Sequence, residues 1–159
     1  MISSPYTAEN WPIAASMLSF GNKDSRGGPI HDAEPEEWAK HLRLVRHIGF
    51  TEVDPTDTWV RVGDLSPERL ADFKSVLSDV GLRIPAISTS RRSVMDPEHG
   101  GEYLAYSHRL LDAAAELGVP MVSFGFFQEF TPEQEQALWF WMAKGWHDDE
   151  SPDVRSRAA

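Results

Sequence analysis

Three short stretches of this chain combine imidazole and carboxylate side chains, which are the ligands that divalent cations accept in proteins. They are His31-Asp32-Ala33-Glu34, Asp96-Pro97-Glu98-His99 and His147-Asp148-Asp149-Glu150. The first two are expected in loops and lack the i, i+4 spacing that places two ligands on one face of a helix. A metal ion held at such a stretch would polarise a carbonyl and favour an enediolate. The alternative is solvated loop charge for the first two stretches and a polar connector before a capped helix for the third.

A second group of residues suits a sugar. A sugar ring has apolar CH patches and many hydroxyls, so aromatic faces, hydroxyls and amides recognise it. Such groups follow the expected strands directly, and the candidate substrate-binding residues are Trp59, Ser88, Ser90, Phe126, Gln128 and Glu129. The alternative for Trp59 and for Phe126 with Phe127 is packing in the core. No catalytic residue is assigned, because the position of Glu52 within a strand favours a structural hydrogen bond over general-base chemistry.

The elements that must position these residues are indicated by a phrase that occurs three times, at 44–50, 76–82 and 114–119. Each copy is the end of an amphipathic helix, a Gly suited to the left-handed position after a helix, one apolar residue and an apolar run. Gly49, Gly81 and Gly118 are 32 and 37 residues apart, which is the length of one βα unit. The spacing predicts a parallel βα array, in which functional residues lie at the carboxyl ends of the strands.

Four strands are expected, at 12–20, 50–53, 83–88 and 119–127, with helices at 36–48, from 66, and at 102–117. Four βα units are about half of the eight units and roughly 250 residues of a closed barrel. The predicted fold class is therefore α/β, with parallel βα units forming roughly half of a TIM barrel that is incomplete or completed by another chain. We expect residues 1–159 to form a single partial barrel domain.

The segment 131–159 is expected to be a helical lid or connector. Thr131-Pro132-Glu133 and Ser151-Pro152-Asp153 each combine an N-cap hydroxyl, a Pro at the first helical position and an acid in the first turn. Residues 137–142 are apolar on nearly all sides of a helix, so they must be buried, either as a lid over the site or against a partner. The open edges of a half barrel favour association.

Composition places the chain among ordinary globular proteins. Its 159 residues are 41% hydrophobic and 25% charged, and it has no cysteine, which excludes disulfides and thiolate metal sites. The net charge of −10 argues against nucleic-acid binding. No stretch approaches the ~20 apolar residues of a membrane span, and there is no signal-peptide pattern, so no membrane association and a cytoplasmic location are expected.

Two segments, 44–53 and 111–120, resemble the xylose isomerase-like TIM barrels, which include sugar phosphate isomerases and epimerases. The first is similar to that family's helix-Gly-aromatic-x-Glu entry to strand two, and the second to its helix three leading into strand four. The resemblance covers most of the chain and the family's N-terminal half. It implies a sugar or sugar phosphate substrate and a divalent metal of the Mn, Mg, Co or Zn type, held by acids and a His from strands five to eight.

The resemblance leaves two functions open. In the first, the chain is the N-terminal half of a metal-dependent sugar (phosphate) isomerase or epimerase and contributes substrate-binding surface, and its partner is a second copy or a complementary half-barrel chain. In the second, it is a noncatalytic truncated half-barrel that acts through association. No metal ligand is assigned within this chain under either reading, because the sequence ends before the strands that carry the family's ligands.

Overall fold

The computed structural model describes residues 13–89, 92–124, 133 and 136. The chain divides into two compact units, Met1–Phe126 and Phe127–Ala159, and every element below belongs to the first. The predictions made for Ser90, Phe126, Gln128 and Glu129, for the acidic run 147–150 and for a lid or connector at 131–159 lie outside the described residues, apart from Glu133 and Gln136.

All four strands of the described chain are parallel, as the βα spacing predicts. Strand β1 (Ala14–Ser16) pairs with β2 (Glu52–Asp54), and β3 (Ile87–Ser88) pairs with β4 (Val122–Ser123). A parallel bridge between Glu52 and Arg83 joins the two pairs, and the Val53 N–H donates to the Arg83 carbonyl at 2.9 Å. The strands therefore lie side by side in chain order, as in part of a TIM barrel wall, and the described residues form no closed barrel.

The strands are shorter than the sequence predicts. Residues 17–19, expected to continue the first strand, form the 3-10 turn η1 (Met17–Ser19), and the Ser16 hydroxyl caps it by accepting from the Leu18 N–H at 3.3 Å. A side chain that bonds its own backbone in this way competes with the strand ladder, which explains the early end of β1.

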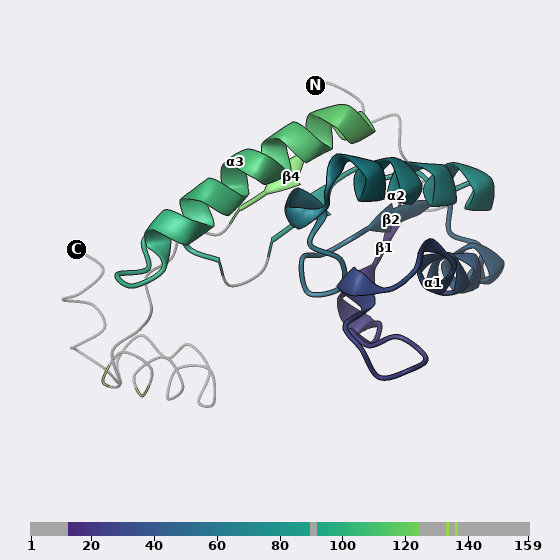
Figure 1. Ribbon diagram of the computed structural model, residues 1–159, viewed down its shortest axis with the longest axis horizontal. Helices are drawn as coiled ribbons and strands as arrows, with labels where there is room; N and C mark the ends of the chain where they lie inside the picture. Colours follow the sequence, from purple (N-terminus) through teal and green to yellow (C-terminus); the bar gives the residue numbers. More distant parts are fainter. Residues whose placement is uncertain (1–12, 90–91, 125–132, 134–135, 137–159) are drawn as a thin grey trace, which may run out of the picture. The chain divides into compact units, whose positions relative to one another are not determined.

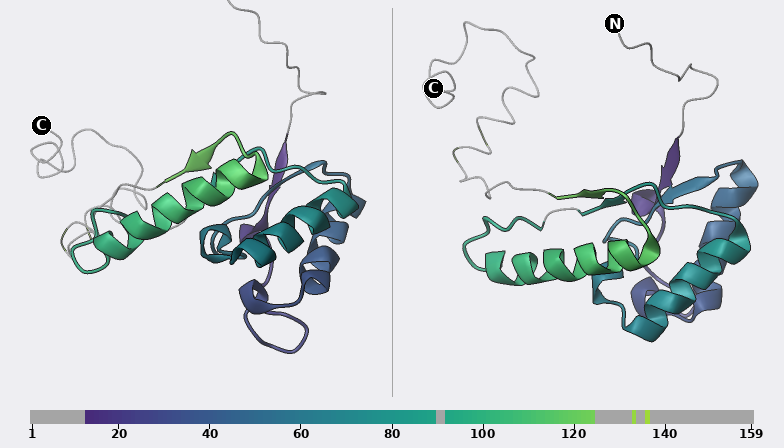
Figure 2. Two further views of the ribbon diagram at one scale, coloured as in Figure 1. Left: turned by 45° about the horizontal axis from the view of Figure 1, so that its top comes forward. Right: turned by 90° about the horizontal axis from the view of Figure 1, so that it is seen from above.

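Three helices cover one side of the strands, as Figures 1 and 2 show. They are α1 (Pro35–Ile48), α2 (Pro67–Val80) and α3 (Gly100–Leu117). The first two begin with Pro, and all three end at a left-handed Gly: Gly49, Gly81 and Gly118 have φ of 112°, 72° and 71°. Within the described part of the chain, none of these helices combines the length and apolarity that crossing a membrane requires.

The core lies between this helical layer and the strands, and aromatic rings form its centre. Trp38 of α1 meets Phe73 of α2 edge-on at 5.5 Å between ring centroids, and the Trp38 indole N–H donates to the carbonyl of Ile30 at 2.7 Å. Ile30 belongs to the 3-10 turn η2 (Ile30–Asp32), so this bond holds the long β1–α1 loop against the first helix. The ring contact and the hydrogen bond of Trp38 thus help to position the loops that begin at the carboxyl ends of the strands.

One glycine permits a close approach of two elements. The 3-10 turn η3 (Val62–Asp64) packs on α3, and a Cβ on Gly63 would lie 2.8 Å from the backbone nitrogen of Leu110. No side chain fits at that distance, so Gly63 lets the β2–α2 loop rest directly on the helix backbone.

Candidate functional site

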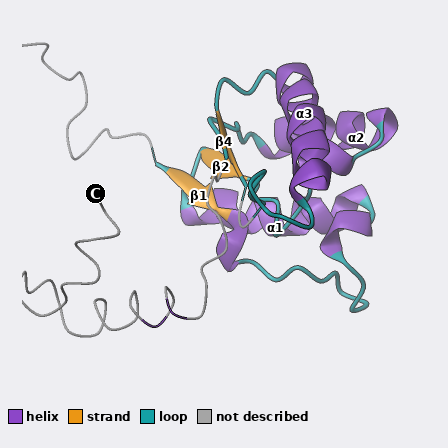
Figure 3. Cartoon of the chain, turned by 90° about the vertical axis from the view of Figure 1, so that its left-hand side faces the viewer, coloured by secondary structure: helices purple, strands orange, loops and turns teal. Residues whose placement is uncertain are grey.

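A row of polar side chains crosses the strands at their carboxyl ends. Val53 and Ile87 are fully buried beneath the helices, and because successive side chains in a strand point to opposite faces, Asp54 and Ser88 point away from the helices. Ser16 is in register with Asp54, and Ser88 is in register with Ser123. We call Ser16, Asp54, Ser88 and Ser123 the carboxyl row. Figure 3 shows the strands on one side of this unit and the helices on the other.

Asp54 and Ser88 join the two strand pairs within this row. The Ser88 hydroxyl donates to Oδ2 of Asp54 at 2.6 Å, and the Ser88 backbone N–H donates to Oδ1 at 2.9 Å. Two hydrogen bonds fix the orientation of the carboxylate. Each carboxylate oxygen still has a lone pair that can accept from a ligand hydroxyl.

A buried ion pair lies next to the row. The Asp57 carboxylate is 2% exposed, and Nε of Arg92, which follows β3, donates to its Oδ2 at 2.5 Å. The Asp57 backbone N–H donates to the Ser88 carbonyl at 3.3 Å, which connects the pair to the carboxyl row. A carboxylate and a guanidinium beside a row of hydroxyls are groups that bind the hydroxyls and oxyanions of a polar ligand.

The predicted substrate-binding residues differ in where the structure places them. Ser88 lies in the carboxyl row with its hydroxyl bonded to Asp54. Trp59 is 2% exposed: its ring packs 6.2 Å from that of Phe73, and its indole N–H donates to Nδ1 of His41 at 3.0 Å. Trp59 therefore packs in the core, which was the alternative to a role in substrate binding. The other four candidates lie outside the described residues.

Glu52 has the structural hydrogen bond expected from its place in a strand, because its carboxylate accepts from Nη2 of Arg83 at 2.9 Å.

The first candidate metal stretch has structural hydrogen bonds. His31 Nδ1 accepts from the Arg61 backbone N–H at 3.2 Å, and Arg69 Nη2 donates to the carbonyls of His31 and Ala33. Burial, followed by the nearby Arg61 charge, lowers the pKa of His31 from its ordinary value. The imidazole thus holds the β1–α1 loop against the segment before η3.

The second stretch forms the turn that leads into α3. Oδ1 of Asp96 accepts from the backbone N–H groups of Glu98 and His99, at 2.9 and 2.6 Å, and the bond from His99 is the main cause of the lowered pKa of Asp96. Across the described chain, no three His, Asp or Glu side chains are arranged to hold a metal ion. The described residues therefore do not fit a divalent metal on their own.

Asp54, Asp57 and Arg92 carry the polar geometry of this edge, and sequence reasoning did not select them. Asp54 and Asp57 follow the second predicted strand directly, in the position where barrel enzymes place functional side chains. Their position directly after a predicted strand was sufficient to predict both aspartates as site residues. Arg92 lies equally close after the third predicted strand, but only the folded chain shows that it pairs with Asp57.

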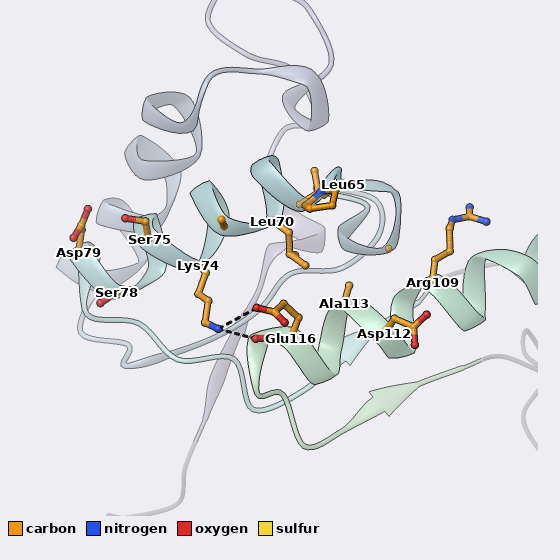
Figure 4. A pocket seen from close by; sticks show the side chains of 13 residues that line it. Leu65, Leu70, Lys74, Ser75, Ser78, Asp79, Arg109, Asp112, Ala113 and Glu116 are labelled. Carbon is orange, nitrogen blue, oxygen red and sulfur yellow. Dashed lines mark hydrogen bonds and ion pairs between the residues drawn. The ribbon is translucent and has the colours of Figure 1, made fainter.

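A larger hollow, of about 950 Å³, lies between α2 and α3 in the helical layer (Figure 4). Lys74 crosses it and donates to the carbonyl of Glu116 at 2.7 Å, and Arg109 and Asp112 lie further along α3. This hollow is on the opposite side of the strands from the carboxyl row, so we do not assign the functional site to it.

Parallel strands in chain order, helices on one side and a polar carboxyl edge define part of an α/β barrel. No protein-family model matches the chain, and no curated protein matches it. A solved structure does: a xylose isomerase-like TIM barrel protein from Mycobacterium smegmatis in complex with magnesium, with 47% identity over 96% of this chain and a TM-score of 0.71. The chain belongs to the xylose isomerase-like TIM barrel superfamily.

The chain spans about half of that relative, covering 49% of its length. A weaker similarity links it to D-psicose 3-epimerase in the presence of D-fructose, with 13% identity over 78% of this chain and 43% of the epimerase and a TM-score of 0.49.

Proposed function

We propose that this chain supplies substrate-binding surface to a sugar isomerase or epimerase barrel. The observation that carries the proposal is the carboxyl row. There, two hydrogen bonds from Ser88 fix the Asp54 carboxylate at the edge where barrel enzymes bind substrate. The 47% identity to a xylose isomerase-like barrel supports an isomerase-like fold.

In this proposal the carboxyl row binds and orients the hydroxyls of a sugar or sugar phosphate. Asp54 accepts from a ligand hydroxyl, Ser88 holds that carboxylate in place, and the Asp57–Arg92 pair keeps the loops after β2 and β3 together. Ser90, Phe126, Gln128 and Glu129 stay proposed contacts by their place after β3 and β4. The buried Trp59 would act through packing beneath the site.

In this proposal, the metal-dependent step takes place only in the complete barrel. The Mycobacterium smegmatis relative was crystallised with magnesium, and a divalent ion would supply the polarisation of a carbonyl that an isomerase needs. In this proposal the ion is held by residues other than the described ones, among which no fitting set of ligands is found.

A chimeric barrel tests the proposal. The half of the Mycobacterium smegmatis protein that this chain matches would be replaced by this chain, and binding of magnesium and of a panel of monosaccharides and their phosphates would be measured. We expect Asp54→Asn to weaken sugar binding about tenfold, as loss of a ligand hydrogen bond to a charged group requires. Ser88→Ala should weaken it less, because the Asp54 carboxylate loses one of the two bonds that orient it. Both variants should leave magnesium binding unchanged. Lys40→Gln, on the exposed surface of α1, is the control.

Sugar affinity that is the same in Asp54→Asn, in Ser88→Ala and in the parent chimera would overturn the proposal. A chimera that folds and binds magnesium but no sugar would favour the alternative, a noncatalytic half-barrel that acts through association.

A further inference from the structure

A smaller hollow, of about 460 Å³, lies between η3, α3 and the segment after β3. Three guanidinium groups line it, from Arg61 before η3, Arg92 after β3 and Arg109 on α3. It adjoins the carboxyl row, because Arg92 is bonded to Asp57 and the Asp57 N–H is bonded to the Ser88 carbonyl. Three cations from three separate segments have thus been brought to one hollow by the fold.

The carboxylates of Asp57 and Asp64 hold these three guanidinium groups in place, and each guanidinium keeps further N–H groups that are not bonded to them. Asp64 accepts from Nε of Arg61 at 3.1 Å and from Nη2 of Arg109 at 2.6 Å, while Asp57 accepts from Nε of Arg92. A guanidinium has five N–H groups, and within the described part of the chain each of these three side chains donates one of them to a carboxylate. The remaining guanidinium N–H groups at the hollow donate to no other described side chain and are available to a ligand.

Tyr106 adds a further donor. Its ring lies under two of the guanidiniums, with the Cζ atoms of Arg92 and Arg109 at 4.7 and 5.8 Å from the ring centroid. Its hydroxyl is buried and has no hydrogen-bond partner among the described residues. Burial, followed by the Asp57 charge, raises the pKa of Tyr106, so this hydroxyl keeps its proton and stays a donor. A buried donor without an acceptor is costly, which indicates that the site is completed by something else.

The missing partner must supply acceptors. The Asp57 and Asp64 carboxylates already accept from guanidiniums, and the Glu102 carboxylate is 80% exposed at the rim, 3.6 Å from Nδ1 of His99. Every hydroxyl of a neutral sugar brings a donor that needs its own acceptor, whereas a phosphate group is anionic, brings mainly acceptor oxygens and matches Arg geometry.

We propose that the hollow lined by Arg61, Arg92, Arg109 and Tyr106 is an oxyanion site that binds a phosphate group. The source of that group is either free phosphate or a phosphorylated sugar, and the site stands whether or not the proposed isomerase function holds.

Calorimetric titration of the full chain with inorganic phosphate, at constant ionic strength in chloride, tests the site. We expect saturable binding that Arg61→Gln and Arg109→Gln each weaken about tenfold, the effect of losing one charge-assisted hydrogen bond. Both side chains are about half exposed, so these variants are expected to fold. Arg43→Gln is the matched control, because Arg43 is an exposed arginine on α1 that pairs only with Glu36 among the described residues.

Tyr106→Phe separates a ligand-binding hydroxyl from a merely structural one. The variant keeps the ring beneath the guanidiniums, and we expect it to raise the melting temperature of the free chain and to weaken phosphate binding. A higher melting temperature with unchanged phosphate affinity would remove the hydroxyl from the site. The absence of phosphate binding, or equal affinity in Arg61→Gln, Arg109→Gln and the parent chain, would overturn the proposal.

Fructose and fructose 6-phosphate identify the source of the phosphate group. Tighter binding of fructose 6-phosphate than of inorganic phosphate would show that the anion arrives attached to a sugar, and equal binding would assign the site to free phosphate. Binding of fructose that matches that of fructose 6-phosphate would contradict an oxyanion site.

Discussion

At the scale of single residues, partly buried polar contacts around the loops that follow the strands join side chains far apart in sequence. The clearest example is Trp59, whose indole N–H donates to Nδ1 of His41 on α1. The His41 ring also packs against the ring of Phe20, with 5.8 Å between their centroids, so its imidazole joins the loop after β1 to the loop after β2. The contact needs a neutral imidazole, because a protonated Nδ1 cannot accept a hydrogen bond.

The stability of the chain should therefore fall as the pH drops below neutral. Burial is the main cause that lowers the pKa values of His31 and His41 below the ordinary 6.5, outweighing the nearby Asp32, Asp64 and Glu37 that raise them. Since the unfolded chain takes up these protons first, the free energy of unfolding is fully retained above pH 6.5 and decreases as the pH falls toward the folded-state values.

Urea unfolding at pH 7.5, 6.5 and 5.5 measures this loss. The double variant His31→Gln/His41→Gln should show a flatter dependence over this range, and His108→Gln, on the exposed surface of α3, should follow the parent chain. An equally steep dependence in the double variant would exclude these two imidazoles as its source.

The Asp57–Arg92 pair gives a second prediction at this scale. Arg92→Ala removes a guanidinium from a carboxylate that is 2% exposed and takes away its stacking on Tyr106, so we expect a loss of about 2 kcal/mol in the free energy of unfolding. Arg43→Ala removes an exposed ion pair and should cost less than about 0.5 kcal/mol. Chemical denaturation compares the two, and equal losses would contradict a structural role for the buried pair.

At the scale of elements, local signals predicted the helices well and the strands less well. Pro35 and Pro67 at helix starts, and Gly49, Gly81 and Gly118 at helix ends, each act through the backbone conformation of one or two residues, which can be read from the sequence. Strand length depends on pairing with a distant segment, so Ser16 ends β1 early while the apolar pattern continues to Phe20. The same non-local dependence explains why Arg92 and Tyr106 could not be predicted as partners in one site.

The packing of η3 on α3 gives a prediction at the element scale. Gly63→Ala places a Cβ 2.8 Å from the backbone nitrogen and 2.9 Å from the Cα of Leu110, and a backbone cannot rotate aside as a side chain can. We expect η3 to separate from α3 at a cost of about 2–3 kcal/mol. Gly101→Ala, in the first turn of the same helix and with open space around the new Cβ, should be neutral or slightly stabilising. Thermal unfolding of both variants checks the difference, and a tolerated Gly63→Ala would show that the contact is looser than described.

At the scale of the whole molecule, exposed apolar side chains concentrate on the first and last units of the βα array. Ile13 and Met121 flank β1 and β4 and are 63% and 62% exposed. Leu44 and Ile48 on α1, and Leu104 and Leu111 on α3, are about half exposed or more. The second unit, with α2, has no large hydrophobic side chain exposed to this degree among the described residues. Apolar surface at both ends of an array is expected where further βα units would pack.

This distribution predicts that the chain alone associates with itself. Burial of Ile13 and Met121 against a second copy would stabilise a dimer, so sedimentation at micromolar concentration should show a species larger than a monomer. The double variant Ile13→Lys/Met121→Lys places charges at both ends of the array and should shift the equilibrium to monomer. Ser75→Lys, on the exposed surface of α2 in the second unit, adds a charge away from both ends and should leave association unchanged. A sharp monomer boundary for the parent chain would contradict association, and equal dissociation in all variants would place the contact elsewhere on the surface.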